Sequence, residues 1–261
     1  MERNHLVDKV AMVTRAAGGV GRAVALRLAR DGADLVLHHE ADEDGARAVA
    51  AEVEALGRKA TVAQASLNDA DSIRAMTAAI SADVPNLHVL VHSAGHGASG
   101  PLTTVDFDDW RETLDINASA MLLLVQGILP ALKAAGAADV IAISNEGSRS
   151  CFSDYGASGT AKAALEALCR NLAFELVHDG IRVNILIAGP TETPGNARLG
   201  YPPAVYAFGE KKSPQGRLGR PDDLAGTVSF LCSADASWIL GQTVVVDGGL
   251  TLGVDFRDWL D

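Results

Sequence analysis

The sequence predicts an α/β protein built on one open, parallel β-sheet of about seven strands, with helices on both faces. Short apolar runs alternate along the chain with longer segments whose apolar residues recur at helical spacing. The chain has 261 residues and is 48% apolar, which is enough to bury the core of one domain. It contains no internal repeat and no linker-like stretch. We therefore expect a single domain over residues 1–261.

The first element is an apolar run, Val10 to Val13, which is followed at once by the glycine-rich stretch Thr14-Arg15-Ala16-Ala17-Gly18-Gly19-Val20-Gly21. From Gly21 to Ala29 the apolar residues recur at helical spacing, and Gly32 is a helix stop signal. A strand, a glycine-rich turn and a helix in this order begin a dinucleotide-binding unit. The predicted architecture is therefore a Rossmann-type doubly wound sheet.

The remaining elements follow the same alternation. Further strands are expected at 34–38, 60–64, 87–92, 140–144, 181–187 and 244–247. Further helices are expected at 43–56, 69–82, 107–133, 155–178 and 222–232. Residues 189–219 are rich in proline and glycine, and their length suggests a loop that acts as a lid over a substrate.

Composition excludes several classes of protein. The 22 basic and 33 acidic residues give a net charge of −11, which disfavours contact with nucleic acid. The three cysteines are odd in number and lack metal-ligand spacing, as in a reduced intracellular protein without a metal site. The amino terminus lacks the apolar core of a signal peptide, and the longest apolar stretch, 118–132, is too short to span a bilayer. We expect a cytoplasmic protein with no membrane partner.

The segment 143–168, ISNEGSRSCFSDYGASGTAKAALEAL, resembles the catalytic segment of the short-chain dehydrogenase/reductase family. The resemblance covers nearly the whole chain and includes GQTVVVDGG at 241–249. That family uses a serine, a tyrosine and a lysine at fixed spacing. When Lys162 is laid on the family lysine, Ser158 falls on the tyrosine and Asn145 on the serine. Asn117 stands where the family keeps an asparagine at a helix kink.

The resemblance implies a role for each of these residues. In the family, the tyrosine exchanges a proton with the substrate oxygen, and the lysine lowers the pKa of that tyrosine and holds the nicotinamide ribose. Lys162 and Asn117 match the family. Ser158 cannot replace the phenol, because an alkyl alcohol is a weaker acid and is shorter, whereas Asn145 can still donate a hydrogen bond. Glu146, which follows Asn145 at a strand end, is the first candidate for a replacement acid or base.

Tyr155 is an alternative proton donor, because the sequence 155–158 resembles the Tyr-x-Ala-Ser of the family. On one helix, Tyr155 and Lys162 would lie roughly 10 Å apart along the axis, against about 6 Å at the family spacing. Side chains also lean toward the helix N-terminus, which would carry Tyr155 further away. The interval from Asn145 to Lys162 already equals that of the family, so the ungapped alignment is the simpler one.

The resemblance also implies NAD or NADP as the cofactor. Arg15 replaces the first glycine of the family turn, whereas Gly19 and Gly21 are kept. Glu40 suits a free ribose 2′-hydroxyl and Arg15 suits a 2′-phosphate, so NAD and NADP both stay open, and the two side chains could instead pair and plug the adenosine site. Ser66 replaces an aspartate that reads the adenine, and His92-Ser93 replaces two asparagines; together the four changes weigh against binding. The other cofactor-binding residues that the resemblance implies are Thr14, Val20, Ala94, Gly95, Lys162, Gly189 and Thr193.

Three functions are compatible with these residues. We favour an enzyme for a non-redox step, such as cyclisation, dehydration or isomerisation of a small carbonyl compound, because the cofactor turn and the catalytic pair are both altered. The second hypothesis is an NAD(P)-dependent oxidoreductase for a ketone or alcohol that uses Tyr155, or a water on Lys162, as proton donor. The third is a non-catalytic binding or partner subunit.

The expected ligand is an apolar or aromatic small molecule, because Tyr201, Tyr206 and Phe208 lie among the prolines of the predicted lid. The family resemblance further implies a homodimer or homotetramer that assembles through the helices at 107–133 and 155–178.

Overall fold

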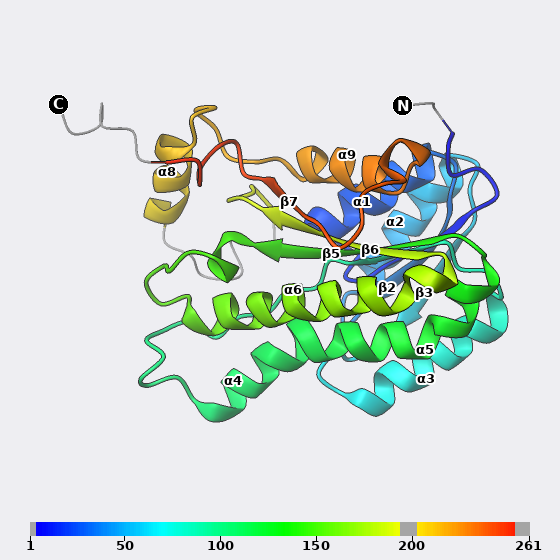
Figure 1. The fold of residues 1–261 in the computed structure, drawn as a ribbon, viewed down its shortest axis with the longest axis horizontal. Helices are drawn as coiled ribbons and strands as arrows, with labels where there is room; N and C mark the ends of the chain where they lie inside the picture. Colours follow the sequence, from blue (N-terminus) through cyan, green and yellow to red (C-terminus); the bar gives the residue numbers. More distant parts are fainter. Residues whose placement is uncertain (1–3, 194–202, 254–261) are drawn as a thin grey trace.

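The computed structural model describes residues 4–193 and 203–253 (Figure 1). All seven strands pair in parallel in one sheet, in the order β3-β2-β1-β4-β5-β6-β7. The strands are β1 (Val10–Val13), β2 (Asp34–His39), β3 (Ala60–Gln64), β4 (Val89–His92), β5 (Ala138–Asn145), β6 (Ile181–Ala188) and β7 (Thr243–Val246). The strand order reverses between β1 and β4, which is where sheets of this type bind ligands. The single Rossmann-type domain that the sequence predicts is confirmed.

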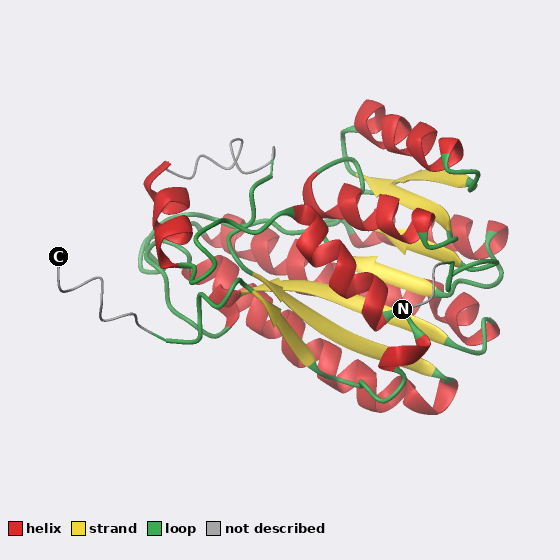
Figure 2. Ribbon diagram, turned by 90° about the horizontal axis from the view of Figure 1, so that it is seen from above, coloured by secondary structure: helices red, strands yellow, loops and turns green. Residues whose placement is uncertain are grey.

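Helices cover both faces of the sheet (Figures 1 and 2). One face packs against α1 (Gly19–Arg30), α2 (Glu43–Ala55) and α9 (Pro221–Leu231). The other face packs against α3 (Ala70–Asp83), α5 (Ala120–Ala134) and α6 (Gly156–Leu176). Two apolar cores result, one on each side of the sheet, and they explain why most strands read as continuous apolar runs rather than as alternating patterns.

The helix predicted at 107–133 consists of three parts. It runs as α4 (Phe107–Leu114), a π-helical turn at Asp115–Ser119, and then α5. By length and composition alone, the helix over Phe107–Ala134 could cross a membrane. The buried side of α5, however, packs in the core beneath the sheet, and core helices are often as long and as apolar. The π-helical turn contains Asn117, whose side-chain amide donates a hydrogen bond to the carbonyl of Thr113, 2.7 Å away. The side chain thus satisfies a backbone acceptor where the helix pattern is interrupted.

The segment 189–219 was predicted to be a loop, and this was wrong in part. It contains the helix α8 (Pro203–Lys212), which stands beside the carboxyl edge of the sheet (Figure 1). Pro203 is the first residue of that helix, a position whose backbone N–H has no intrahelical acceptor and which therefore tolerates proline. Tyr201 and the side chain of Phe208 lie outside the described residues.

Candidate active site

Lys162 is held at the carboxyl edge of the sheet, where the ends of β4 and β5 meet. Its ammonium group donates hydrogen bonds to the carbonyls of Ala94, 3.1 Å away, and Ile143, 2.8 Å away. The side chain is buried, and burial lowers the pKa of Lys162 to about 8. Two backbone acceptors therefore fix a cation at the point where the family resemblance places the catalytic lysine.

The side chain of Tyr155 reaches Asn145. The amide nitrogen of Asn145 donates a hydrogen bond to the Tyr155 hydroxyl over 2.8 Å, and the other side-chain atom, Oδ1, accepts a bond of 3.0 Å from the backbone N–H of Gly147. The Tyr155 ring packs edge-on against Phe152 and lies so close to Gly147 that a Cβ there would stand 2.7 Å from two ring carbons. The phenol is thus placed beside the residue that aligns with the family serine.

Tyr155 stands at the N-terminal end of α6. It immediately precedes the helix, with φ −116° and ψ 5°, and its carbonyl accepts the first intrahelical hydrogen bond, 2.9 Å from the N–H of Gly159. Asp154 before it has φ +59°, in the left-handed region, and this turn redirects the chain at the start of the helix. The expectation that Tyr155 and Lys162 lie roughly 10 Å apart along the helix axis therefore stays a prediction.

The Ser158 side chain points toward the loop after β4. It lies in the first turn of α6 and is buried, and its hydroxyl faces Gly97 so closely that it would overlap any Cβ at that position. The loop after β4 thus fills the space around Ser158. The hydroxyl packs against this loop, whereas Tyr155 reaches the end of β5.

Asn117 and Lys162 both lie beside Gly95. The side-chain amide of Asn117 donates to the carbonyls of Thr113 and of His96, the latter 2.6 Å away. Its Oδ1 is buried and has no hydrogen-bond partner among the described residues. This oxygen and the Lys162 ammonium each lie 3.7 Å from the point where a Cβ on Gly95 would stand. An unpartnered acceptor therefore shares the surroundings of the buried cation.

Glu146 titrates near neutrality. Burial, and then the nearby charge of Asp247, raise the pKa of the Glu146 carboxyl to about 7. Its Oε1 has no hydrogen-bond partner among the described residues and lies 3.1 Å from the position of a Cβ on Gly189. The Glu146 carboxyl thus faces the ends of β6 and β7, whereas Asn145 turns to Tyr155. Glu146 remains a candidate acid or base, on the β7 side of the site.

The glycine-rich turn is built tightly. Gly19 has φ +56°, and a Cβ there would stand 3.6 Å from Thr193, so the turn and the segment after β6 lie close together. A Cβ at Gly21 would overlap the Arg15 carbonyl, so the start of α1 requires glycine at this point. Val20 lies in the first turn of α1.

Thr14 joins the ends of β1 and β4. Its hydroxyl accepts hydrogen bonds from the backbone N–H groups of Ser93, 3.0 Å away, and Ala94, 3.2 Å away. The Ser93 hydroxyl donates in turn to the Thr14 carbonyl. These bonds link the two central strands where the family has asparagines. His92 is fully buried, and burial with the charge of Lys162 lowers its pKa to about 3, which leaves a neutral imidazole.

The predicted pairing of Arg15 with Glu40 is confirmed. One guanidinium nitrogen of Arg15 lies 2.9 Å from the Glu40 carboxylate, and another donates to the carbonyl of Gly95. The other oxygen of Glu40 accepts a 3.2 Å bond from the backbone N–H of Leu67. Ser66, beside Leu67, donates its hydroxyl to Asn68. Arg15 therefore connects the end of β2 with the end of β4, across β1.

These residues fit a nicotinamide dinucleotide in all but one respect. The glycine turn leaves open space at Gly18, where a Cβ would meet nothing within 4 Å, and Lys162 presents its cation at the strand ends. The exception is Arg15, whose guanidinium lies at the edge where the resemblance places the adenosine ribose. Its side chain is 40% exposed and is held by one ion pair and one hydrogen bond, so it can leave this position without disturbing the core.

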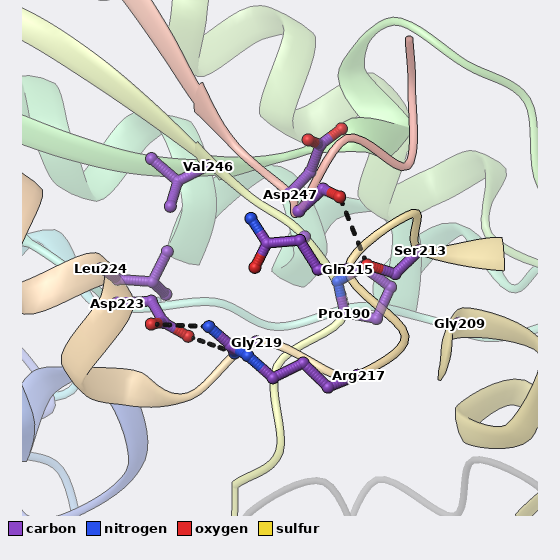
Figure 3. Close-up of a pocket in the computed structure, with 12 residues that line it drawn as sticks. Pro190, Gly209, Ser213, Gln215, Arg217, Gly219, Asp223, Leu224, Val246 and Asp247 are labelled. Atoms are coloured by element: carbon purple, nitrogen blue, oxygen red, sulfur yellow. Dashed lines mark hydrogen bonds and ion pairs between the residues drawn. The ribbon is translucent and has the colours of Figure 1, made fainter. Parts of the chain in front are cut away.

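A cavity of about 250 Å³ opens between the loop after β6, the end of β7 and the start of α9 (Figure 3). Its lining consists of Gly189, Pro190, Gly209, Ser213, Gln215, Arg217, Gly219, Asp223, Leu224, Val246, Asp247 and Gly248. Arg217 is bound to Asp223 on one wall, with 2.7 Å between nitrogen and oxygen. None of the lining residues within the described ranges is aromatic, so the expectation of an aromatic ligand surface stays a prediction.

The strand order, the glycine turn and the lysine at the strand ends are typical of α/β domains with the Rossmann-type, NAD(P)-binding fold. Residues 16–251 match the family model described as "Enoyl-(Acyl carrier protein) reductase". The chain belongs to the short-chain dehydrogenase/reductase family. It is 38% identical to dehydrogenase/reductase SDR family member 4 of Oryctolagus cuniculus over 253 residues, which cover 95% of each chain.

Two solved structures are similar over their whole length. One is a putative NAD(P)-dependent gluconate 5-dehydrogenase from Beutenbergia cavernae with bound NADP, which is 32% identical with a TM-score of 0.89, covering 95% of this chain and 98% of that one. The other is angucycline C-6 ketoreductase LanV with bound NADP, 28% identical with a TM-score of 0.88, covering 97% and 99%. These relatives are named as oxidoreductases, which agrees better with the second hypothesis from the sequence than with the favoured non-redox reaction.

Proposed function

We propose that this protein is an NAD(P)-dependent oxidoreductase that interconverts a ketone and an alcohol, with Tyr155 as the acid and base at the substrate oxygen. The observation that carries the proposal is the 2.8 Å hydrogen bond between Asn145 and the Tyr155 hydroxyl. This bond supplies a phenol at the end of β5, although the aligned position holds Ser158. The names of the relatives support the same class of reaction.

The chain's own groups supply the proton chemistry. In the direction of reduction, the Tyr155 hydroxyl gives its proton to the oxygen of the substrate carbonyl. The phenolate that remains accepts a hydrogen bond from the Asn145 amide. We propose that the positive charge of Lys162 also stabilises this phenolate, as the family resemblance implies. The side-chain oxygen of Asn117 has no hydrogen-bond partner among the described residues and lies near Lys162. We propose that this oxygen connects the Lys162 ammonium group to further proton acceptors.

The cofactor site is proposed at the glycine-rich turn. Gly19 and Gly21 would let a pyrophosphate approach the start of α1, and Glu40 and Lys162 would hold the two riboses. When bound, the dinucleotide supplies or accepts the hydride. We propose that the segment 189–219 is the lid of this site. Thr193 belongs to that segment and lies against Gly19, so it would cover the glycine-rich turn.

A second candidate is the non-redox reaction that the sequence favoured. It is supported by Arg15, which lies across the cofactor crevice, and by Glu146, whose carboxyl has a pKa near 7 and can exchange protons at neutral pH. In that reaction Glu146 would replace the tyrosine of the family as acid or base. This candidate requires turnover in the complete absence of nicotinamide.

The two candidates separate in a transfer experiment. The protein is incubated with a panel of small aliphatic and aryl ketones and with NADPH or NADH that carries deuterium at both C4 positions, and the products are examined by mass spectrometry. We expect an alcohol that carries one deuterium. Conversion that proceeds equally without the dinucleotide, or a product without deuterium, would contradict hydride transfer and favour the second candidate.

We also propose a homo-oligomer, as the family resemblance implies. Leu122 of α5 is 37% exposed and Phe174 of α6 is 83% exposed, so both helices carry apolar surface away from the sheet. Light scattering on the purified protein tests this assembly, and a monomer at every concentration would contradict it.

A further inference from the structure

The Arg15 side chain lies across the opening between the ends of β2 and β4. We propose that Arg15 makes this protein select the dinucleotide that carries a 2′-phosphate, by leaving Glu40 and Gly95 when the nucleotide enters and binding that phosphate. The inference rests on the proposed function, because it concerns the same dinucleotide site. It assigns the choice between NAD and NADP, which the sequence leaves open.

The position of the guanidinium is the first argument. It is bonded to the Glu40 carboxylate at 2.9 Å and to the Gly95 carbonyl, so it spans the sheet edge on both sides of β1. Glu40 directly follows β2, the place where Rossmann-type domains hold the ribose hydroxyls of the adenosine. The cation is thus already beside the position of the 2′ substituent in the protein without nucleotide.

The backbone of Arg15 is fixed, so only the side chain is free to turn. Arg15 has φ +50°, in the left-handed region that favours glycine. Its N–H donates to the ring nitrogen Nδ1 of His38, 3.1 Å away, and its carbonyl packs against Gly21. His38 is buried, and its other ring nitrogen, Nε2, donates to the Ala65 carbonyl, so the strand ends hold the Arg15 backbone.

Charge is the second argument. A Glu40 carboxylate alone would repel the dianionic 2′-phosphate, but Arg15 lies within ion-pair distance and offsets that charge. With NADP, the guanidinium exchanges one anionic partner for a phosphate, which accepts charge-assisted, bidentate hydrogen bonds. With NAD, the ribose carries a neutral 2′-hydroxyl, so the guanidinium would give up the Gly95 carbonyl without gaining an anion at the 2′ position. The exchange therefore favours the phosphorylated nucleotide.

The test is a set of binding titrations by nicotinamide fluorescence and calorimetry, with NADPH and NADH, on the wild type and two variants. We expect the wild type to bind NADPH about 10-fold or more tightly than NADH, the size of one charge-assisted contact. Arg15→Gly, which suits φ +50°, should weaken NADPH binding and tighten NADH binding, so that the preference disappears or reverses. Glu40→Gln should increase the preference, because the repulsive carboxylate is removed and Arg15 is released.

The matched control is Arg22→Gln. Arg22 forms a comparable exposed ion pair with Glu52, at 2.7 Å, but on the outer surface of α1, so its removal changes the net charge equally and should leave the NADPH-to-NADH ratio unchanged. If Arg15→Gly tightens both nucleotides by the same factor, Arg15 is only a plug and the inference is overturned. An unchanged ratio in Arg15→Gly overturns it as well.

The readout is independent of turnover. A protein that shows the expected preference but transfers no hydride would contradict the proposed function and support this inference. A protein that transfers hydride from both nucleotides, and whose NADPH-to-NADH affinity ratio is the same in Arg15→Gly, would support the proposed function and contradict this inference.

Discussion

The Asn145 amide donates a 2.8 Å hydrogen bond to the hydroxyl of Tyr155, and this bond brings the phenol to the end of β5. In sequence the two residues are ten positions apart, and alignment to the family assigns the tyrosine position to Ser158 instead. The bond therefore places a phenol at the end of β5 from a different position in the chain than the aligned one.

Gly147→Ala should lower the turnover number about 10-fold or more while leaving nucleotide affinity within twofold, because a small misplacement of a catalytic group is costly. The added Cβ would stand 2.7 Å from the Tyr155 ring and would push the phenol away from Asn145. Steady-state kinetics and nucleotide titration check this. Gly253→Ala is the control, since a Cβ at Gly253 meets nothing within 4 Å. Equal activity in the two variants would show that the position of Tyr155 is unimportant.

Ser158→Tyr, which restores the aligned family residue, should not raise activity. The Ser158 hydroxyl already packs against Gly97 in a buried place, so a phenol there would overpack the site. We expect a loss of about 1–3 kcal/mol in the free energy of unfolding, measured by urea denaturation. The smaller variant Ser158→Ala should lose less. A rise in reductase activity in Ser158→Tyr would mean that the phenol belongs at this position rather than at residue 155.

Glu146→Gln should stabilise the protein at alkaline pH. In the folded protein, burial and the charge of Asp247 raise the Glu146 pKa to about 7 from its ordinary value of 4.5, so the folded state resists ionisation of this carboxyl. The destabilisation is absent below pH 4.5, grows as the pH rises to about 7, and is complete above it. Removing the charge should therefore add up to about 3 kcal/mol at pH 8 and nothing at pH 4.

Unfolding curves of the Gln variant at these two pH values test this expectation. Glu54→Gln, on the exposed side of α2, is the control and should change stability at neither pH. A gain of the same size for Glu146→Gln at both pH values would mean that the stabilisation does not come from ionisation.

Nucleotide binding should weaken above pH 8. Burial lowers the pKa of Lys162 to about 8, so the ammonium that would hold the ribose is present below this pH and lost above it. Dissociation constants for NADPH measured between pH 6 and 10 should rise through this region. In Lys162→Met, binding should be weaker at pH 7 and nearly independent of pH. Constant affinity of the wild type up to pH 10 would contradict the role of Lys162.

The fold was accessible from the sequence because it depends on local patterns. The apolar run Val10 to Val13 before a glycine-rich turn is a strand-to-helix signal that needs no distant contact, and β1 forms over those residues. Asn117 was likewise expected at a helix interruption, and it lies in the π-helical turn. The pairing of Arg15 with Glu40 was one of several alternatives that the sequence left open, and the structure shows it.

The hydrogen bond between Tyr155 and Asn145 did not follow from the sequence, because helical spacing gives no information on a contact between a helix start and a strand end. The helix begins one residue after Tyr155, and Asp154 before it adopts the left-handed region, which no pattern of apolar residues encodes. The one available signal was Gly147, two residues after Asn145, which leaves space for an aromatic ring. The helix α8 was missed for a related reason, since proline at its first residue reads as a loop signal.

The central claim is that Tyr155 is the proton donor and acceptor of an NAD(P)-dependent ketone–alcohol reaction. Tyr155→Phe keeps the ring against Gly147 and Phe152 and removes only the hydroxyl that Asn145 binds. The most direct measurement is the rate of NADPH-dependent ketone reduction by the wild type and by this variant. We predict a loss of about 10²–10⁴-fold in turnover, the usual contribution of a general acid, with nucleotide binding retained. An unchanged rate in Tyr155→Phe would contradict the account.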